Sequence, residues 1–237
     1  MTAGHRLAHD GRVVSPVVLR YPLLGRFRVR NSPARRVPSH GTDLLGERYA
    51  IDFTGVDDRG RTAAHRGWGG YVGTEPPERF FAFGRPILAP AAGVVVDVHD
   101  GEIDHVARRS PLSLLPYLLG QASRLRRGVG AIAGNYVIIA LAEDAGYLAL
   151  VHLRAGSLRV RAGDTVGIGH PLAECGNSGN STQPHVHVQV MDSPDLSIAR
   201  GVPVAFRRYR EWPAGATHPQ PREIGIPGEG AIVEALL

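Results

Sequence analysis

Two histidines stand one residue apart in the segment His185-Val186-His187. Successive side chains of a β-strand point to opposite faces, so both imidazoles are expected on one face, and Val186, Val188 and Val190 on the other. Neighbouring imidazoles suit a protein core poorly, because each has two ring nitrogens that need partners. The pair therefore indicates one metal ligand and one catalytic group, with a structural role for both as the alternative.

Three further residues could take part in the same chemistry, although each also has a structural interpretation. His152 lies in an apolar run and shares a strand face with Leu148 and Leu150, where a hydrogen-bonded core histidine is the more common case. Asp52 lies near the end of another apolar run, and a buried carboxylate there needs a cation or several donors. His40 lies in a glycine-containing turn and indicates nothing by itself.

Short apolar or alternating runs predict the strands that would position these residues. The expected strands are 13–19, 26–29, 49–53, 93–98, 135–141, 147–153 and 185–191. The glycine-punctuated segments 163–166 and 169–172 predict a tight hairpin. Residues 54–84 are rich in glycine, proline and charge and predict a long irregular loop. The proline- and glycine-rich chain after Trp212 is expected to be peripheral or partly disordered.

One segment, 110–128, is helical in pattern. Its leucines and alanine recur at three- and four-residue spacing, at Leu112, Leu115, Leu118, Leu119, Ala122 and Leu125. Ser110-Pro111 suits a helix start and Gly128 a helix end, while Pro116 would kink or restart the helix. We interpret the segment as a helical insertion packed on a β domain.

Composition sets the remaining bounds. The 237 residues are 43% apolar and 21% charged, as expected for one globular domain, and 30 glycines with 18 prolines favour short strands and turns. The net charge of +5 suits an anionic partner, although solubility alone explains it equally well. A lone cysteine, Cys175, excludes an intramolecular disulfide and is interpreted as a small core residue. No apolar window is long enough to predict a membrane-spanning helix.

In chain order, residues 38–192 resemble the lysostaphin or LytM-type peptidoglycan endopeptidases. The matching segments are His40 and Asp52, Asn135-Tyr136-Val137-Ile138-Ile139, Tyr147 to Leu153, Gly163 to Gly169, and Gly176-Asn177-Ser178-Gly179-Asn180-Ser181 continuing to His185-Val186-His187. The last of these segments is the most specific, and the ordered set is far more specific than any member alone.

The resemblance implies that His40, Asp52 and His187 bind Zn²⁺ and that His152 and His185 are catalytic groups beside a zinc-activated water. Two histidines, one carboxylate and an open fourth position are the usual layout of a catalytic zinc site. The implied activity is a zinc metalloendopeptidase that hydrolyses peptidoglycan peptides. The alternative is a non-catalytic wall-binding or activator module on the same fold.

The sequence departs from the family pattern in three respects. His40 and Asp52 are twelve residues apart, whereas the family spacing is about four; Asp43 is nearer but lacks the strand context, so Asp52 is preferred. Gln183 replaces a glycine of the family, and Val188-Gln189 replaces Phe-Glu. The segments 54–84 and 110–128 are insertions that could narrow or cap the groove.

Other classes of protein fit less well. A lipoyl- or biotinyl-carrier domain would need a lysine at a hairpin tip, and the sequence contains no lysine. A nucleic-acid-binding role lacks interleaved aromatic residues and a basic stripe, so no nucleic-acid partner is expected. The glycines at 128, 130 and 134 mimic part of a dinucleotide fingerprint, but a strand follows them where a helix is required.

The expected fold is α+β and mostly β, with antiparallel sheets forming a groove and a helical insertion near 110–128. We divide the chain into N-terminal strands (1–36), a peptidase domain (37–212) with insertions at 54–84 and 103–130, and a tail (213–237), and we expect a monomer. Charged residues interrupt the first twenty positions, so no signal peptide is recognised. The resemblance favours the cell envelope as the site of action, with the cytoplasm as the alternative.

Overall fold

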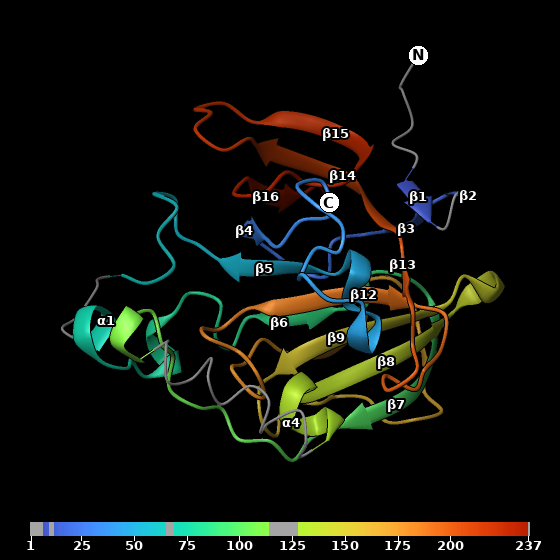
Figure 1. Ribbon diagram of the computed structural model, residues 1–237, viewed down its shortest axis with the longest axis horizontal. Coiled ribbons are helices and arrows are strands. Elements are labelled where there is room, and N and C mark those ends of the chain that lie inside the picture. Colours follow the sequence, from blue (N-terminus) through green and yellow to red (C-terminus); the bar gives the residue numbers. More distant parts are fainter. Residues whose placement is uncertain (1–6, 10–11, 65–68, 114–127, 237) are drawn as a thin grey trace.

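A sheet of twelve strands dominates the computed structural model, which describes residues 7–9, 12–64, 69–113 and 128–236 (Figure 1). Its strands are β3 Val17–Leu19, β4 Arg26–Arg30, β5 Ile51–Gly55, β7 Gly93–His99, β8 Asn135–Leu141, β9 Tyr147–Leu153, β10 Thr165–Val166, β12 Val186–Met191, β13 Gly201–Val202, β14 Val204–Trp212, β15 Gln220–Gly225 and β16 Ile232–Ala235. They follow the order β10-β7-β8-β9-β12-β5-β4-β16-β14-β15, with β13 on β12 and β3 on β14. Within this sheet the paired strands are antiparallel except β14 and β3.

The remaining elements are small. They are the pair β1 Leu7–His9 and β2 Arg12–Val14, the pair β6 Pro86–Leu88 and β11 Pro171–Glu174, the α-helices α1 Gly69–Val72 and α4 Val129–Ala133, and the 3₁₀ helices η1 Leu44–Tyr49, η2 Pro77–Arg79 and η3 Ala142–Asp144. Residues 111–113 are also helical. Most of the predicted helix over 110–128 falls on residues 114–127, which lie outside the described part of the chain. The fold prediction, α+β and mostly β, is confirmed.

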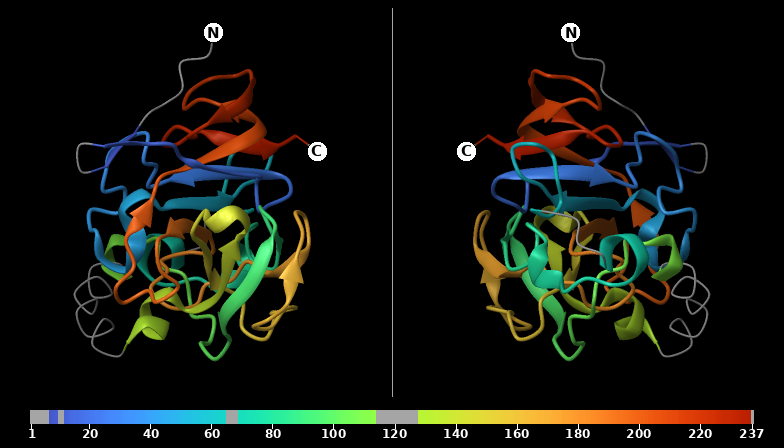
Figure 2. Two further views of the ribbon diagram at one scale, coloured as in Figure 1. Left: turned by 90° about the vertical axis from the view of Figure 1, so that its right-hand side faces the viewer. Right: turned by 90° about the vertical axis from the view of Figure 1, so that its left-hand side faces the viewer.

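The central strands have one face in the main core and the other toward a separate surface. Residues at alternate positions, such as Phe53 on β5, Val188 on β12 and Leu150 on β9, are fully buried in the largest apolar cluster. That cluster also contains residues of β14 and β16, so the two ends of the sheet contribute to one core. Figures 1 and 2 show the strands stacked from β7 and β8 at one end to β14–β16 at the other.

One local prediction is wrong, and a second is wrong only in part, because β15 is exposed at the edge of the sheet, as expected of a peripheral tail. The segments around 163–172 do not pair with each other: β10 pairs with β7, and β11 pairs with β6. The glycines there instead let the chain cross from one sheet to the other. The chain after Trp212 forms β15 and β16, and Val233 is buried in the main core, because its prolines and glycines lie mainly in the turns between strands.

The described parts of the segment 54–84, residues 54–64 and 69–84, are largely irregular between β5 and β6, as predicted, apart from α1 and η2. A bidentate ion pair between the buried Glu75 and Arg109, both distances 2.7 Å, ties this segment to the chain before residue 110. In the described part of the chain, no helix is long and apolar enough to span a membrane.

Candidate metal centre

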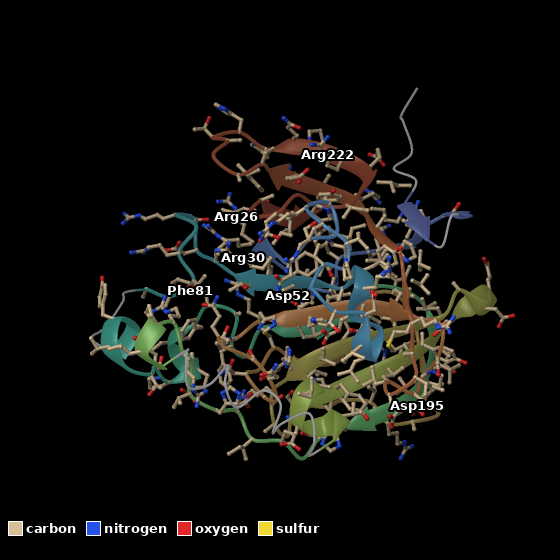
Figure 3. All side chains as sticks on the ribbon, viewed as in Figure 1. Arg26, Arg30, Asp52, Phe81, Asp195 and Arg222 are labelled. Atoms are coloured by element: carbon tan, nitrogen blue, oxygen red, sulfur yellow. The ribbon has the colours of Figure 1, made fainter. Side chains whose placement is uncertain are left out.

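The sheet register places Asp52 and His187 side by side on the face opposite the main core. Asp52 of β5 pairs directly with His187 of β12, and residues that face each other in an antiparallel ladder point to the same side. Val186 and Val188 point into the core, as the strand alternation predicted. Figure 3 shows Asp52 near the centre of the molecule, on the face of β5 that points away from the main core.

His40, Asp52 and His187 form a compact cluster of potential metal ligands. One ligand atom from each lies within 4.8 Å of the other two. His40 Nε2 is 3.2 Å from Asp52 Oδ2, and His187 Nδ1 is 3.0 Å from Asp52 Oδ1. Two imidazole nitrogens and one carboxylate oxygen are a donor set that zinc prefers, so the residues present fit this metal.

The unusual spacing between His40 and Asp52 is explained by the chain between them. The 3₁₀ helix η1 occupies Leu44–Tyr49 and returns the chain to β5, with Leu45 held at φ 56°. Ser39 anchors the His40 turn, because its backbone N–H donates to Arg48 and its hydroxyl to Glu47. Asp43 points elsewhere and receives a hydrogen bond from Arg48 at 2.7 Å.

His152 reaches the site through a β-bulge. Asn135 pairs with Leu153 and Tyr136 with Val151, so His152 is the extra residue on β9 and has φ 63°. The prediction that His152 shares a face with Leu148 and Leu150 is therefore wrong: the bulge turns its side chain to the opposite face. There its ring centroid is 4.8 Å from that of His185 and 6.0 Å from that of His187.

The glycine-rich loop before β12 supports this bulge. Ser178 accepts the Asn135 N–H and donates to the Leu153 carbonyl, both through its hydroxyl. Gly179 and Gly134, both at positive φ, pack backbone against backbone, and a Cβ on either would lie within 2.4 Å of the other segment. This close approach explains the glycine at 134, at the end of α4.

Hydrogen bonds fix which ring nitrogen of each histidine faces the site. His152 Nδ1 donates to the Ser178 carbonyl at 2.9 Å, and His185 Nδ1 donates to the Gln183 carbonyl at 2.8 Å. Each therefore keeps the lone pair of Nε2 for the site, and His185 Nε2 is 3.7 Å from Asp52 Oδ1. Both are available as proton acceptors.

Asp52 and the histidines around it shift one another's pKa values. Burial alone would raise the pKa of Asp52, but the surrounding histidines outweigh it and hold the pKa well below its usual value. Burial would lower the pKa of His187, but its hydrogen bond to Asp52 and that carboxylate's charge raise it to about 9. Burial, followed by the neighbouring histidines, lowers the pKa of His152 well below its usual value. For His185 burial also dominates and lowers the pKa, although Asp52 opposes it.

Two amide side chains form hydrogen bonds with residues of the cluster. Asn31, at φ 51° after the end of β4, donates to Asp52 Oδ2 at 2.8 Å, and no sequence pattern indicated it. Gln189 accepts from His187 Nε2 at 2.7 Å and donates to the Leu45 carbonyl at 2.7 Å. Because His187 Nε2 donates to Gln189, Nδ1 is the nitrogen that remains for a metal.

Replacing Gln189 by leucine is expected to weaken zinc binding about 10- to 100-fold, because His187 loses the acceptor that orients its ring. Gln189→Glu keeps an acceptor at that position and should retain zinc. Competition with a chromogenic chelator measures both affinities. Gln220→Leu, on the exposed β15, is the matched control. An unchanged affinity in Gln189→Leu would exclude this role.

The cluster lies in a hollow of about 350 Å³. Thr42, Leu44 and Leu45 line one part of it, and Ile132, Ala133 and Leu196 another. Both His152 and His185 border the same hollow as the three ligand candidates. The site therefore combines a possible metal donor set and two further histidines around one hollow.

Fold and donor set together define a β domain with a cluster of three potential metal ligands beside two further histidines. Residues 120–202 match the model of "Peptidase family M23". The match includes His152, His185 and His187 and ends before β14. No curated protein matches the chain.

Several solved structures are similar in fold. The catalytic domain of lysostaphin from Staphylococcus simulans is 18% identical, with 68% of this chain and 80% of that one covered and a TM-score of 0.37. The prophage-encoded M23 protein EnpA from Enterococcus faecalis is 21% identical, with 60% of this chain and 94% of that one covered and a TM-score of 0.34. A zinc-containing peptidase from Vibrio cholerae is 18% identical, with 60% of this chain and 46% of that one covered and a TM-score of 0.31. In two further matches this chain covers only 44% and 40% of the other chain. These similarities are too distant to transfer residue roles.

Proposed function

We propose that the chain is a zinc-dependent endopeptidase that hydrolyses peptide bonds of bacterial peptidoglycan. The observation that supports this most is the cluster of His40, Asp52 and His187, with ligand atoms within 4.8 Å, beside two histidines that keep an acceptor nitrogen for the site. The match of residues 120–202 to the M23 peptidase model supports the substrate class.

In this proposal His40 Nε2, an oxygen of Asp52 and His187 Nδ1 hold the metal. A Zn²⁺ ion so held would supply Lewis-acid chemistry, polarising a carbonyl and lowering the pKa of water to about 7. Because a zinc-bound imidazole must be unprotonated at the ligand nitrogen, His187 gives up its Nδ1 proton when metal binds. Gln189 keeps the proton on Nε2 and the ring in place.

His152 and His185 then act on protons and on developing charge. Each is neutral and has its Nδ1–H committed to a backbone carbonyl, so Nε2 accepts a proton from the attacking water. Once protonated, the same nitrogen donates to the oxyanion or to the leaving amine. His185 Nε2 lies 3.7 Å from Asp52 Oδ1, and the charge of this carboxylate favours the protonated form of both histidines.

The proposal is tested by metal removal. We expect the purified protein to release soluble fragments from isolated peptidoglycan, to lose this activity on dialysis against a chelator, and to regain it with about one equivalent of Zn²⁺ per chain. Release of new amino termini distinguishes peptide cleavage from glycan cleavage. If the zinc-loaded protein binds peptidoglycan without releasing amino termini, the alternative of a non-catalytic module is correct.

A further inference from the structure

The face of the sheet that holds the metal cluster continues onto β4, where it presents three arginines. Arg30 pairs directly with Asp52, and Arg28 pairs with Thr54, so both point to the same side as Asp52. Arg26 follows by the same alternation, while Phe27 and Val29 are buried in the core. In Figure 3, Arg30 lies between Arg26 and Asp52. We call Arg26, Arg28 and Arg30 the arginine row.

The arginine row is only weakly neutralised by the protein. Arg30, with half its side chain exposed, has Glu229 at 4.0 Å, the limit of an ion pair. Arg26 contacts Asp58 at 3.1 Å, but the Asp58 side chain is 94% exposed, and such pairs are weak. The second partner of Arg26, Glu234, is 3.9 Å away, close to the limit of an ion pair. Arg28 donates to the Gly60 carbonyl at 2.7 Å, and its buried Nε has no acceptor among the described residues.

Like charges lie next to each other along this row. Residues two apart on a strand face are separated by about 7 Å, and side-by-side cations repel. In agreement with this, burial and then the neighbouring Arg30 lower the pKa of Arg28. An anionic ligand would relieve the repulsion, and a planar guanidinium suits a carboxylate because it can donate two parallel hydrogen bonds.

Space for a ligand exists at both ends of the row. Beyond Arg30 lies Asn31, which borders the hollow of the metal centre. At the other end, Arg26 and Arg28 line a second hollow of about 570 Å³ together with Arg59 and Trp212, and Arg26 stacks on the Trp212 ring. Arg30 lies on the strand next to that of Asp52, and neighbouring strands are about 5 Å apart.

We propose that the arginine row binds free carboxylates of an acidic peptide whose central bond lies over His40, Asp52 and His187. The substrate class in this proposal rests on the proposed peptidase function, whereas the preference for an acidic peptide rests on the arrangement of the row. Arg30 is the residue nearest the reacting bond, and Arg26 and Arg28 extend the contact away from it.

The test uses labelled, end-blocked, glycine-rich peptides with glutamate two and four residues from the central bond, on one side or the other, and their glutamine counterparts. Fluorescence anisotropy measures binding, and chromatography verifies that each peptide is intact. We expect the wild-type protein to bind one acidic peptide about tenfold more tightly than its glutamine counterpart, with the preference falling as salt rises.

Arg30→Gln should remove most of this preference without changing the affinity for the glutamine peptide, and Arg30→Glu should reverse it. Arg161→Gln is the matched control, because Arg161 is 89% exposed and lies just before β10, at the other end of the sheet. Equal binding of acidic and amide peptides by the wild type, or an equal loss in Arg161→Gln, would overturn the proposal. Anisotropy measures binding and does not depend on cleavage. If the protein cleaves no peptide, the proposed function is contradicted, but the measured affinities still show whether the arginine row binds acidic peptides.

Discussion

His187→Ala is expected to lose nearly all bound zinc and, with it, all peptide cleavage. In the proposed site His187 supplies one of the three ligand atoms, so the loss in affinity should exceed the ~100-fold upper range for removing an outer hydrogen-bond partner. Elemental analysis after dialysis should fall from about one Zn²⁺ per chain to near zero. His170→Ala, at an exposed histidine, is the matched control and should keep its zinc.

The His187 variant must also be shown to fold. Removing this ring takes away one of the partners of Asp52, which is only 6% exposed, but His40 and Asn31 still contact the carboxylate. We therefore expect a folded domain with a lower melting temperature in the metal-free state, measured by circular dichroism. Stoichiometric zinc in the folded variant would remove His187 from the ligand set.

Strand alternation was enough to predict one half of the site. The spacing in His185-Val186-His187 placed both imidazoles opposite the buried valines, and the apolar run ending near Asp52 placed the carboxylate on a strand. Which two strands are neighbours does not follow from alternation, because pairing depends on the whole sheet. The direct register of Asp52 against His187 is therefore visible only in the structure.

The other half of the site depends on irregular backbone that a periodic pattern cannot describe. The bulge at His152 inserts one residue and reverses the face of everything after it, so strict alternation placed this side chain in the core. Asn31 reaches Asp52 from a positive-φ position just beyond β4, without any distinguishing motif. The twelve-residue separation of His40 from Asp52 looked anomalous because η1, which closes the distance, is short and irregular.

The glycine-rich segments were ambiguous for a similar reason. Glycine and proline mark turns but do not say which strands the turns connect, so the segment 163–172 looked like a hairpin although it joins two sheets. After Trp212 the same residues suggested a loose tail, whereas β16 lies between β4 and β14 and buries Val233. Long-range pairing decided the structure in both cases.

His185→Ala and His152→Ala are each expected to keep zinc near one equivalent and to lower kcat by about 100- to 10,000-fold, the usual contribution of a positioned acid–base group. Neither side chain belongs to the His40, Asp52 and His187 cluster, so the metal site should remain. The measurements are zinc content and the steady-state rate of peptide cleavage, with KM determined separately to show that binding is retained.

A variant that loosens His185 without removing it provides the control. The Ser181 hydroxyl oxygen is 3.1 Å from His185 Nδ1, but the Gln183 carbonyl accepts a hydrogen bond from the same nitrogen at 2.8 Å. Ser181→Ala should therefore reduce kcat by much less than His185→Ala, with zinc unchanged. Wild-type cleavage by both histidine variants would refute the proposed mechanism, whereas loss of zinc from either would move that residue into the ligand set.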